Sequence, residues 1–244
     1  MKAVALITGA ALRIGAEISQ TLHEAGFTIA IHYRNSKAPA EALMQTLNNK
    51  RPNSAAIFQA DLNSTAQVQQ MAADVVSHFG QVDLLVNNAS SFYPTAIGSI
   101  SEDNWNDLFN SNVKGAFFLS QALVPTLQQH LGSIINIVDI HAERPLKNYS
   151  VYCMAKAALA MMTKSLAKEL GPQVRVNGVS PGAIIWPEHG DFSEQEKNLI
   201  LDRVALQRSG KPNDIATTVK FLACDAPYIT GQIIAVDGGR SLTN

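Results

Sequence analysis

Short apolar runs alternate with longer segments of helical periodicity along the whole chain, and this alternation restricts the possible folds most. The runs lie at residues 3–7, 27–32, 54–60, 82–89, 133–139, 174–179 and 232–236. They are continuously apolar rather than alternating, which is typical of parallel strands buried on both faces. The sequence therefore predicts a single α/β domain over residues 1–244, a Rossmann-type doubly wound parallel sheet with helices on both faces.

Between these runs, apolar residues recur at the spacing of a helix face. Ile14, Ile18, Leu22 and Ala25 form one such stripe, and Gly26 is placed to end that helix. Further helices are predicted over residues 38–50, 64–80, 103–129, 150–170 and 213–223. The segment 183–208 fits the pattern least. A lid over a binding site and an ordinary surface excursion both agree with its polar character.

Composition excludes several classes of protein. Hydrophobic residues make up 46% and charged residues 16%, which excludes a disordered or coiled-coil chain. A formal net charge of −1 gives no general attraction to nucleic acid or anionic membranes. Cys153 and Cys224 are too few for a disulfide framework, and the six histidines show no metal-ligand spacing. With no signal peptide and no apolar run near about eighteen residues, we expect a soluble, cytoplasmic protein without a metal.

A glycine-containing turn follows the first predicted strand and opens the first predicted helix. Its residues are Thr8, Gly9, Arg13, Ile14 and Gly15, with Ala10 to Leu12 between them. Glycine permits a tight turn and the close approach of a phosphate to backbone N–H groups at a helix N-terminus. The position favours a dinucleotide site, and a plain strand-to-helix turn is the alternative.

The end of the second strand bears on the choice of dinucleotide. Enzymes that use NAD usually carry an acidic residue there, which accepts from the ribose 2′-OH. Residues 32–36 contain none, and Arg34, Ser36 and the nearby Arg13 could meet a 2′-phosphate instead. The sequence favours NADP(H) over NAD, with a solvated basic loop as the alternative. Asp61, after the third strand, could hold adenine or cap a helix.

Tyr152 and Lys156 are four residues apart on a predicted helix, so both project from one face. A neighbouring ammonium favours phenolate, which would lower the pKa of Tyr152 and suit proton transfer during hydride transfer. Asp139 ends the fifth predicted strand and points to the same crevice. A surface Tyr–Lys pair is the alternative.

Two amides could reach that crevice. Asn88 closes the fourth strand, where a side-chain amide can hold backbone or cofactor, and Asn112 lies inside the long predicted helix, which it could disturb. The alternatives are a turn amide for Asn88 and a helix-face amide for Asn112.

Taken together, these motifs resemble the short-chain dehydrogenase/reductase family along essentially the whole chain. The resemblance includes the glycine turn, Asn87-Asn88-Ala89, Asn112, Tyr152 with Lys156, and Ser180-Pro181-Gly182. Arg13 stands where the family usually has the middle glycine, and Asp139 where it has the catalytic serine. Both features are similar to pteridine reductases, as are residues 87–95 and 236–243.

This resemblance implies roles for particular residues. Phe92 would stack on a pterin, Ser90 and Arg13 would contact pterin and phosphate, and Asp139 with Tyr152 would protonate a ring nitrogen. Lys156 would hold the nicotinamide ribose. The implied NADPH-binding set is completed by His32, Tyr33, Asp61, Leu62, Asn88, Ala89, Ser90, Pro181 and Gly182.

The expected function is that of an NADPH-dependent pteridine reductase that forms tetrahydropterins. A dihydromonapterin or dihydrofolate reductase on the same scaffold and a 3-oxoacyl or other carbonyl reductase are the enzymatic alternatives. An NADPH-sensing regulator without turnover is the alternative outside enzymes, and the set of Asp139, Tyr152 and Lys156 argues against it. The resemblance also implies a homotetramer.

Overall fold

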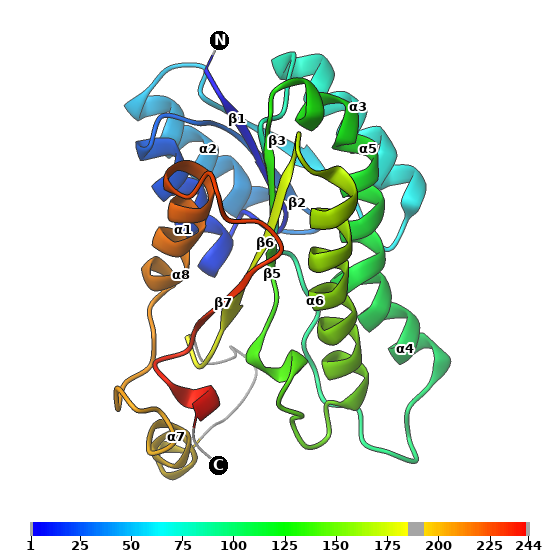
Figure 1. Ribbon diagram of the computed structural model, residues 1–244, viewed down its shortest axis with the longest axis vertical. Helices are drawn as coiled ribbons and strands as arrows, with labels where there is room; N and C mark the ends of the chain where they lie inside the picture. The colour runs from blue at the N-terminus through cyan, green and yellow to red at the C-terminus, as the bar shows by residue number, and fades with distance from the viewer. Residues whose placement is uncertain (1, 185–192, 243–244) are drawn as a thin grey trace.

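The computed structural model describes residues 2–184 and 193–242 (Figure 1). One parallel sheet has the strand order β3-β2-β1-β4-β5-β6-β7. Its strands are β1 Val4–Ile7, β2 Thr28–Tyr33, β3 Ala55–Gln59, β4 Leu84–Asn87, β5 Ser133–Ile137, β6 Arg175–Pro181 and β7 Ile233–Val236. The predicted doubly wound parallel fold is confirmed.

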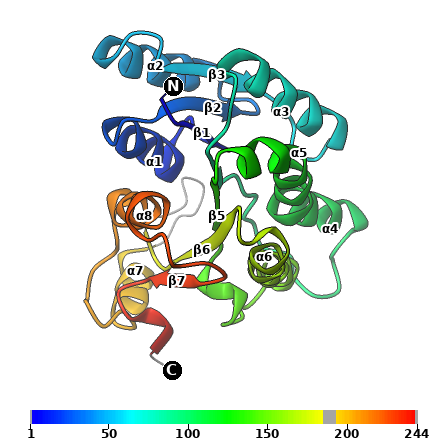
Figure 2. The same ribbon diagram turned by 45° about the horizontal axis from the view of Figure 1, so that its top comes forward.

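Helices cover both faces of this sheet (Figure 2). Helices α1, α2 and α8 pack on one face, and α3, α5 and α6 pack on the other. The α-helices are α1 Arg13–Glu24, α2 Lys37–Lys50, α3 Thr65–Phe79, α4 Glu102–Phe109, α5 Gly115–Gln129, α6 Ser150–Leu170, α7 Glu194–Leu201 and α8 Pro212–Lys220. Shorter turns are η1 Asn110–Lys114, η2 Ile140–Ala142, η3 Phe221–Asp225 and η4 Arg240–Leu242.

The two helical layers explain why the strands are apolar throughout. Along β1, Ile7 packs into the core on the side of α1, whereas its neighbour Leu6 packs into the core on the side of α3 and α5. Both side chains are completely buried. Because successive strand residues point to opposite faces, a strand between two layers must be apolar at every position.

Local signals set several boundaries. The Ser64 hydroxyl accepts a hydrogen bond from the Gln67 N–H and caps α3, and Gly80 ends that helix with a φ of 82°. The predicted helix over 103–129 is instead divided by the π-helical turn η1. Asn112 lies in this turn, and its amide donates to the Leu108 carbonyl, so a side chain competes with the regular backbone pattern there.

The polar segment 183–208 contains helix α7, which the sequence pattern did not predict. Part of the predicted lid, residues 185–192, lies outside the described residues, and the lid stays a prediction. Within residues 2–184 and 193–242, no helix combines the length and apolar character needed to cross a membrane.

Candidate active site

The glycine turn after β1 is tied to the end of β4. The Thr8 Oγ1 accepts from the backbone N–H groups of Asn88 and Ala89, at 2.9 and 3.0 Å. In return, the Asn88 side-chain amide donates to the carbonyls of Thr8 and Gly9, at 2.9 and 3.2 Å. Asn88 therefore holds the backbone of the turn. The sequence left open whether the Asn88 amide holds backbone or cofactor, and the structure shows it holding backbone.

Gly9 and Gly15 are required by the geometry of the turn. Gly9 has a φ of 60°, and a Cβ at Gly15 would lie 2.2 Å from the Gly9 carbonyl oxygen. Helix α1 begins at Arg13, so Gly15 lies in its first turn, and the N-cap residue Leu12 gives no side-chain hydrogen bond. The first N–H groups of α1 can therefore bind a phosphate. Arg13 is exposed at the first helical position, with a φ of 54°, beside these groups.

His32 lies buried behind the turn. The Gly9 N–H donates to its Nδ1 at 3.1 Å, so in the neutral ring the proton is on Nε2, which donates to the Ala60 carbonyl at 3.1 Å. The sequence analysis placed His32 among residues that contact the cofactor. Both of its ring nitrogens are hydrogen-bonded within the protein, so the side chain supports the turn, and its contact with the cofactor stays a prediction. Tyr33 and Leu62, predicted in the same set, are also buried, in the two cores on opposite faces of the sheet.

We expect His32 to make stability depend on pH. Burial lowers the pKa of its imidazole to about 4, whereas an exposed histidine titrates near 6.5. The unfolded chain binds the proton first, so stability falls as pH decreases from about 6.5 to 4, by about 3 kcal/mol in total. Urea unfolding at a series of pH values checks this: His32→Gln should remove that part of the slope. His78→Gln, at an exposed histidine of α3, should retain it, and an equal slope in both variants would contradict the assignment.

A polar hollow of about 250 Å³ opens between the ends of β2 and β3. Arg34, Asn35, Gln59, Ala60, Asp61 and Gln67 line it. Arg34 Nη1 lies 3.9 Å from Asp61 Oδ1, and both side chains are exposed. Ser36 stands at the N-cap of α2 and makes no cap bond with its side chain. These groups could hold the adenosine end of a dinucleotide.

Asp139, Tyr152 and Lys156 come together beyond the end of β5. The Tyr152 hydroxyl donates to Asp139 Oδ2 at 2.8 Å, and the His141 N–H donates to Asp139 Oδ1 at 2.8 Å. The Lys156 ammonium donates to the Ile137 carbonyl at 2.9 Å and lies 5.7 Å from the centre of the Tyr152 ring. The carboxylate is thus fixed by a phenol and a backbone N–H, and one helix presents both Tyr152 and Lys156.

The electrostatics of Tyr152 differ from the sequence expectation. We expected the Lys156 ammonium to lower the pKa of Tyr152. Burial, followed by the negative charge of Asp139, instead holds the pKa of Tyr152 well above its ordinary value near 10. Burial also lowers the pKa of Lys156 to about 8. Burial outweighs any attraction between the phenolate and the Lys156 ammonium. The phenol therefore stays protonated and donates a hydrogen bond to the Asp139 carboxylate.

The aromatic side chain of Phe92 is exposed beside Tyr152. Phe92 is 41% exposed and meets the Tyr152 ring edge-on, with ring centroids 4.8 Å apart. One face of Phe92 stacks on Tyr149, at 4.6 Å and an interplanar angle of 17°. A bridge between Thr95 and Tyr149 joins the two loops that carry these rings. The sequence analysis missed Tyr149, although its position three residues before Tyr152 is a usable signal.

The remaining predicted residues border the same end of the sheet. Asn112 donates to the Ser91 carbonyl at 3.0 Å, which connects the π-turn to the loop that carries Ser90 and Phe92. Ser90 is exposed on that loop. Pro181 ends β6, and a Cβ on Gly182 would lie 2.7 Å from the Asp237 Cα. Asn112 thus binds loop backbone instead of standing on an open helix face.

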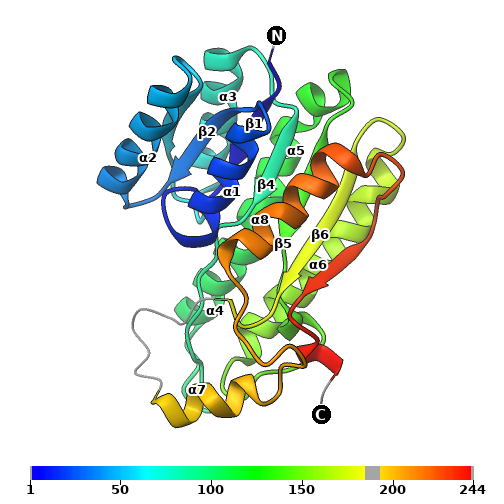
Figure 3. The same ribbon diagram turned by 90° about the vertical axis from the view of Figure 1, so that its left-hand side faces the viewer.

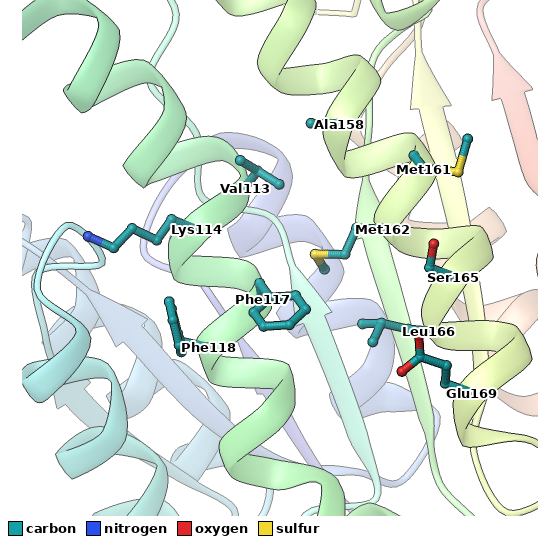
Figure 4. Close-up of a pocket in the computed structure, with 10 residues that line it drawn as sticks. All are labelled: Val113, Lys114, Phe117, Phe118, Ala158, Met161, Met162, Ser165, Leu166 and Glu169. Carbon is teal, nitrogen blue, oxygen red and sulfur yellow. The ribbon is translucent and has the colours of Figure 1, made fainter. Parts of the chain in front are cut away.

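A larger hollow, of about 530 Å³, lies between α5 and α6 (Figure 4). Phe117, Met161, Met162 and Leu166 give it an apolar lining. None of the predicted site residues borders it. The predicted site residues lie instead at the carboxyl edge of the sheet.

A parallel sheet with a glycine turn after its first strand is the arrangement typical of doubly wound dinucleotide-binding folds. Residues 9–241 match a family model described as enoyl-(acyl carrier protein) reductase. The chain is 41% identical to pteridine reductase 1 of Leishmania tarentolae, over 98% of this chain and 96% of that protein. It is 39% identical to a 3-oxoacyl-[acyl-carrier-protein] reductase of Staphylococcus epidermidis, over 98% and 99%.

The fold has a solved counterpart of the same kind. A double mutant of a Serratia marcescens short-chain dehydrogenase/reductase superposes with a TM-score of 0.92 and 33% identity, covering 98% of both chains. The protein belongs to the short-chain dehydrogenase/reductase family of oxidoreductases.

Proposed function

We propose that this protein is an NADPH-dependent pteridine reductase, which reduces oxidised or dihydro pterins to tetrahydropterins. The observation that carries the proposal is the 2.8 Å hydrogen bond from Tyr152 to the Asp139 carboxylate, beside the exposed ring of Phe92. A phenol paired with a carboxylate suits protonation of a ring nitrogen, and an exposed aromatic ring suits a flat heterocycle. The similarity to a pteridine reductase over nearly the whole chain supports the same function.

The proposed reaction adds a hydride to the carbon and a proton to the nitrogen of a ring C=N bond. Bound NADPH supplies the hydride from its nicotinamide. Tyr152 holds the proton at its phenol oxygen, and Asp139 orients that hydroxyl through its fixed carboxylate. After the proton is given up, Lys156 offsets the negative charge left on the pair, and solvent restores the proton.

Phe92 would bind the pterin ring. Tyr149 covers one of its faces, so the other face is the surface on which a planar substrate would stack. Ser90 and Arg13 would hydrogen-bond the edge of the pterin and the phosphates. The same loop would therefore position the ring beside the hydroxyl of Tyr152.

We further propose that Arg34 selects the 2′-phosphate of NADPH. Arg34→Ala should reduce the preference for NADPH over NADH by about tenfold, because a charge-assisted hydrogen bond is lost. The ratio of kcat/KM for the two cofactors measures this. Lys37→Ala removes another exposed cation, one that lies 3.8 Å from Glu41, and should leave the ratio unchanged. An unchanged ratio in Arg34→Ala would move phosphate recognition to other residues.

A second candidate function is 3-oxoacyl reduction, because a 3-oxoacyl reductase is nearly as similar to this chain as the pteridine reductase is. NADPH oxidation with dihydrobiopterin, dihydromonapterin, dihydrofolate and a 3-oxoacyl ester tests both. We expect the dihydropterins to be reduced fastest. Turnover of the ester alone would favour the second function, and NADPH binding without any turnover would favour a regulator.

The homotetramer and the cytoplasmic location stay predictions that rest on family resemblance and on composition. Neither enters the chemistry proposed here, which uses residues of one chain.

A further inference from the structure

The polar hollow at the ends of β2 and β3 lies where the chain leaves the sheet in two directions. Strand β2 is followed by α2 on one face of the sheet, whereas β3 is followed by α3 on the other (Figures 2 and 3). Residues 32–36, at the end of β2, contain no acidic residue. The tertiary structure nevertheless brings an aspartate from the end of β3, Asp61, into the same hollow as Arg34. A ligand that enters this hollow therefore meets both a cation and an anion.

The backbone around Asp61 is held by three hydrogen bonds. The Asp61 N–H donates to Gln67 Oε1 at 2.8 Å, and the Ser64 N–H donates to the Asp61 carbonyl at 2.9 Å. The Asn63 N–H donates to Asp61 Oδ1 at 3.0 Å, which also orients the side chain. The negative charge of Asp61 is therefore kept in place at the wall of the hollow.

Arg34 lies on the neighbouring strand end, close to this charge. Gln59 Nε2 donates to the Arg34 carbonyl at 3.0 Å and so ties the backbone of Arg34 to β3. Arg34 Nη1 lies 3.9 Å from Asp61 Oδ1. A phosphate oxygen bonded to that nitrogen at about 2.8 Å would therefore lie within about 7 Å of the Asp61 oxygen. The cation that attracts a phosphate thus brings it close to a charge that repels it.

We propose that Asp61 limits the preference of this protein for NADPH, because its charge opposes the 2′-phosphate held by Arg34. Two exposed charges about 7 Å apart still interact at physiological ionic strength, where the screening length is about 8 Å. NADH carries a neutral 2′-hydroxyl at that position and meets no such repulsion. Asp61 is therefore a specificity-determining residue that acts against Arg34. The inference rests on the proposed function, since it concerns the cofactor of that reaction.

Asp61→Asn tests this proposal, because asparagine keeps the oxygen that accepts from the Asn63 N–H and removes only the charge. Fluorescence titration gives the Kd for NADPH and for NADH, and contacts with the parts that the two nucleotides share cancel in the ratio. We expect the preference for NADPH to rise about threefold at low ionic strength, the scale of a repulsion across about 7 Å of solvent. At about 1 M salt, the substituted and unsubstituted proteins should show the same preference.

Two further measurements separate the charge of Asp61 from its other contacts. Calorimetric titration with adenosine 2′,5′-bisphosphate and with 5′-AMP should show the same rise without a nicotinamide. Asp61→Ser also keeps an oxygen for the Asn63 N–H, and it should act like Asp61→Asn. The matched control is Glu24→Gln, which removes an exposed carboxylate at the end of α1 that pairs with Lys50 at 2.9 Å. It should leave the ratio unchanged.

The same titrations can contradict the proposal. An unchanged or lower preference for NADPH in the folded Asp61 variants, or an equal rise in Glu24→Gln, would overturn the role of Asp61 and leave the proposed pterin reduction intact. If the unsubstituted protein bound neither NADPH nor NADH, the proposed function would be overturned together with this inference.

Discussion

Tyr152→Phe is expected to lower the turnover of dihydropterin by about 10²- to 10⁴-fold, the range that a positioned general acid contributes. The ring remains, so the edge contact with Phe92 and the packing of α6 should survive. The substitution removes the hydroxyl group that carries the transferable proton and donates a hydrogen bond to Asp139. Asp139→Ser should cause a loss of the same order, because a serine hydroxyl cannot provide the carboxylate that fixes the phenol.

Steady-state kinetics and NADPH titration together distinguish a chemical role from a structural one. We expect kcat to fall in both variants while the Kd for NADPH changes little. Tyr93→Phe is the matched control, because it removes another phenol that bonds a carboxylate, that of Asp107 at 3.1 Å. It should leave kcat almost unchanged. Parallel losses of turnover and NADPH affinity in the Tyr152 and Asp139 variants would show that these residues support the fold instead.

Gly15→Ala is expected to abolish tight dinucleotide binding and to destabilise the protein by about 3 kcal/mol, the upper range for overpacking. The new methyl group would lie 2.2 Å from the Gly9 carbonyl oxygen and 2.7 Å from the Asn88 amide nitrogen. Because these distances are too short for non-bonded atoms, the Gly9 carbonyl or the Asn88 side chain must move. Either displacement disrupts the hydrogen bonds that tie the turn to β4 and the N–H groups that α1 offers to a phosphate.

Thermal unfolding and fluorescence titration with NADPH measure the two effects of Gly15→Ala separately. Gly80→Ala is the control, since Gly80 has a φ of 82° in open space, far from the turn along the chain. It should cost about 1–2 kcal/mol of stability through backbone strain, with unchanged NADPH affinity. Wild-type NADPH affinity in Gly15→Ala would contradict the close packing of the turn.

Local sequence signals were sufficient for the architecture. Helix α6 begins and ends where its periodicity predicted, at Ser150 and Leu170, and Ser64 and Gly80 bound α3 as expected. Such signals act within a few residues, so the chain records them directly. Helix α7 was missed because no comparable apolar stripe marks it, and η1 interrupts a helix for a reason that lies in another loop, the Ser91 carbonyl bonded by Asn112.

The sequence by itself determined the parallel sheet, the glycine turn, and the meeting of Asp139, Tyr152 and Lys156 at one edge, because periodicity and strand ends are local properties. Only the tertiary structure decided that His32 supports the turn and that Tyr149 stacks on one face of Phe92. It also reversed the expected pKa shift of Tyr152. Burial and contacts between distant segments set these properties, and neither is encoded at a fixed spacing along the chain.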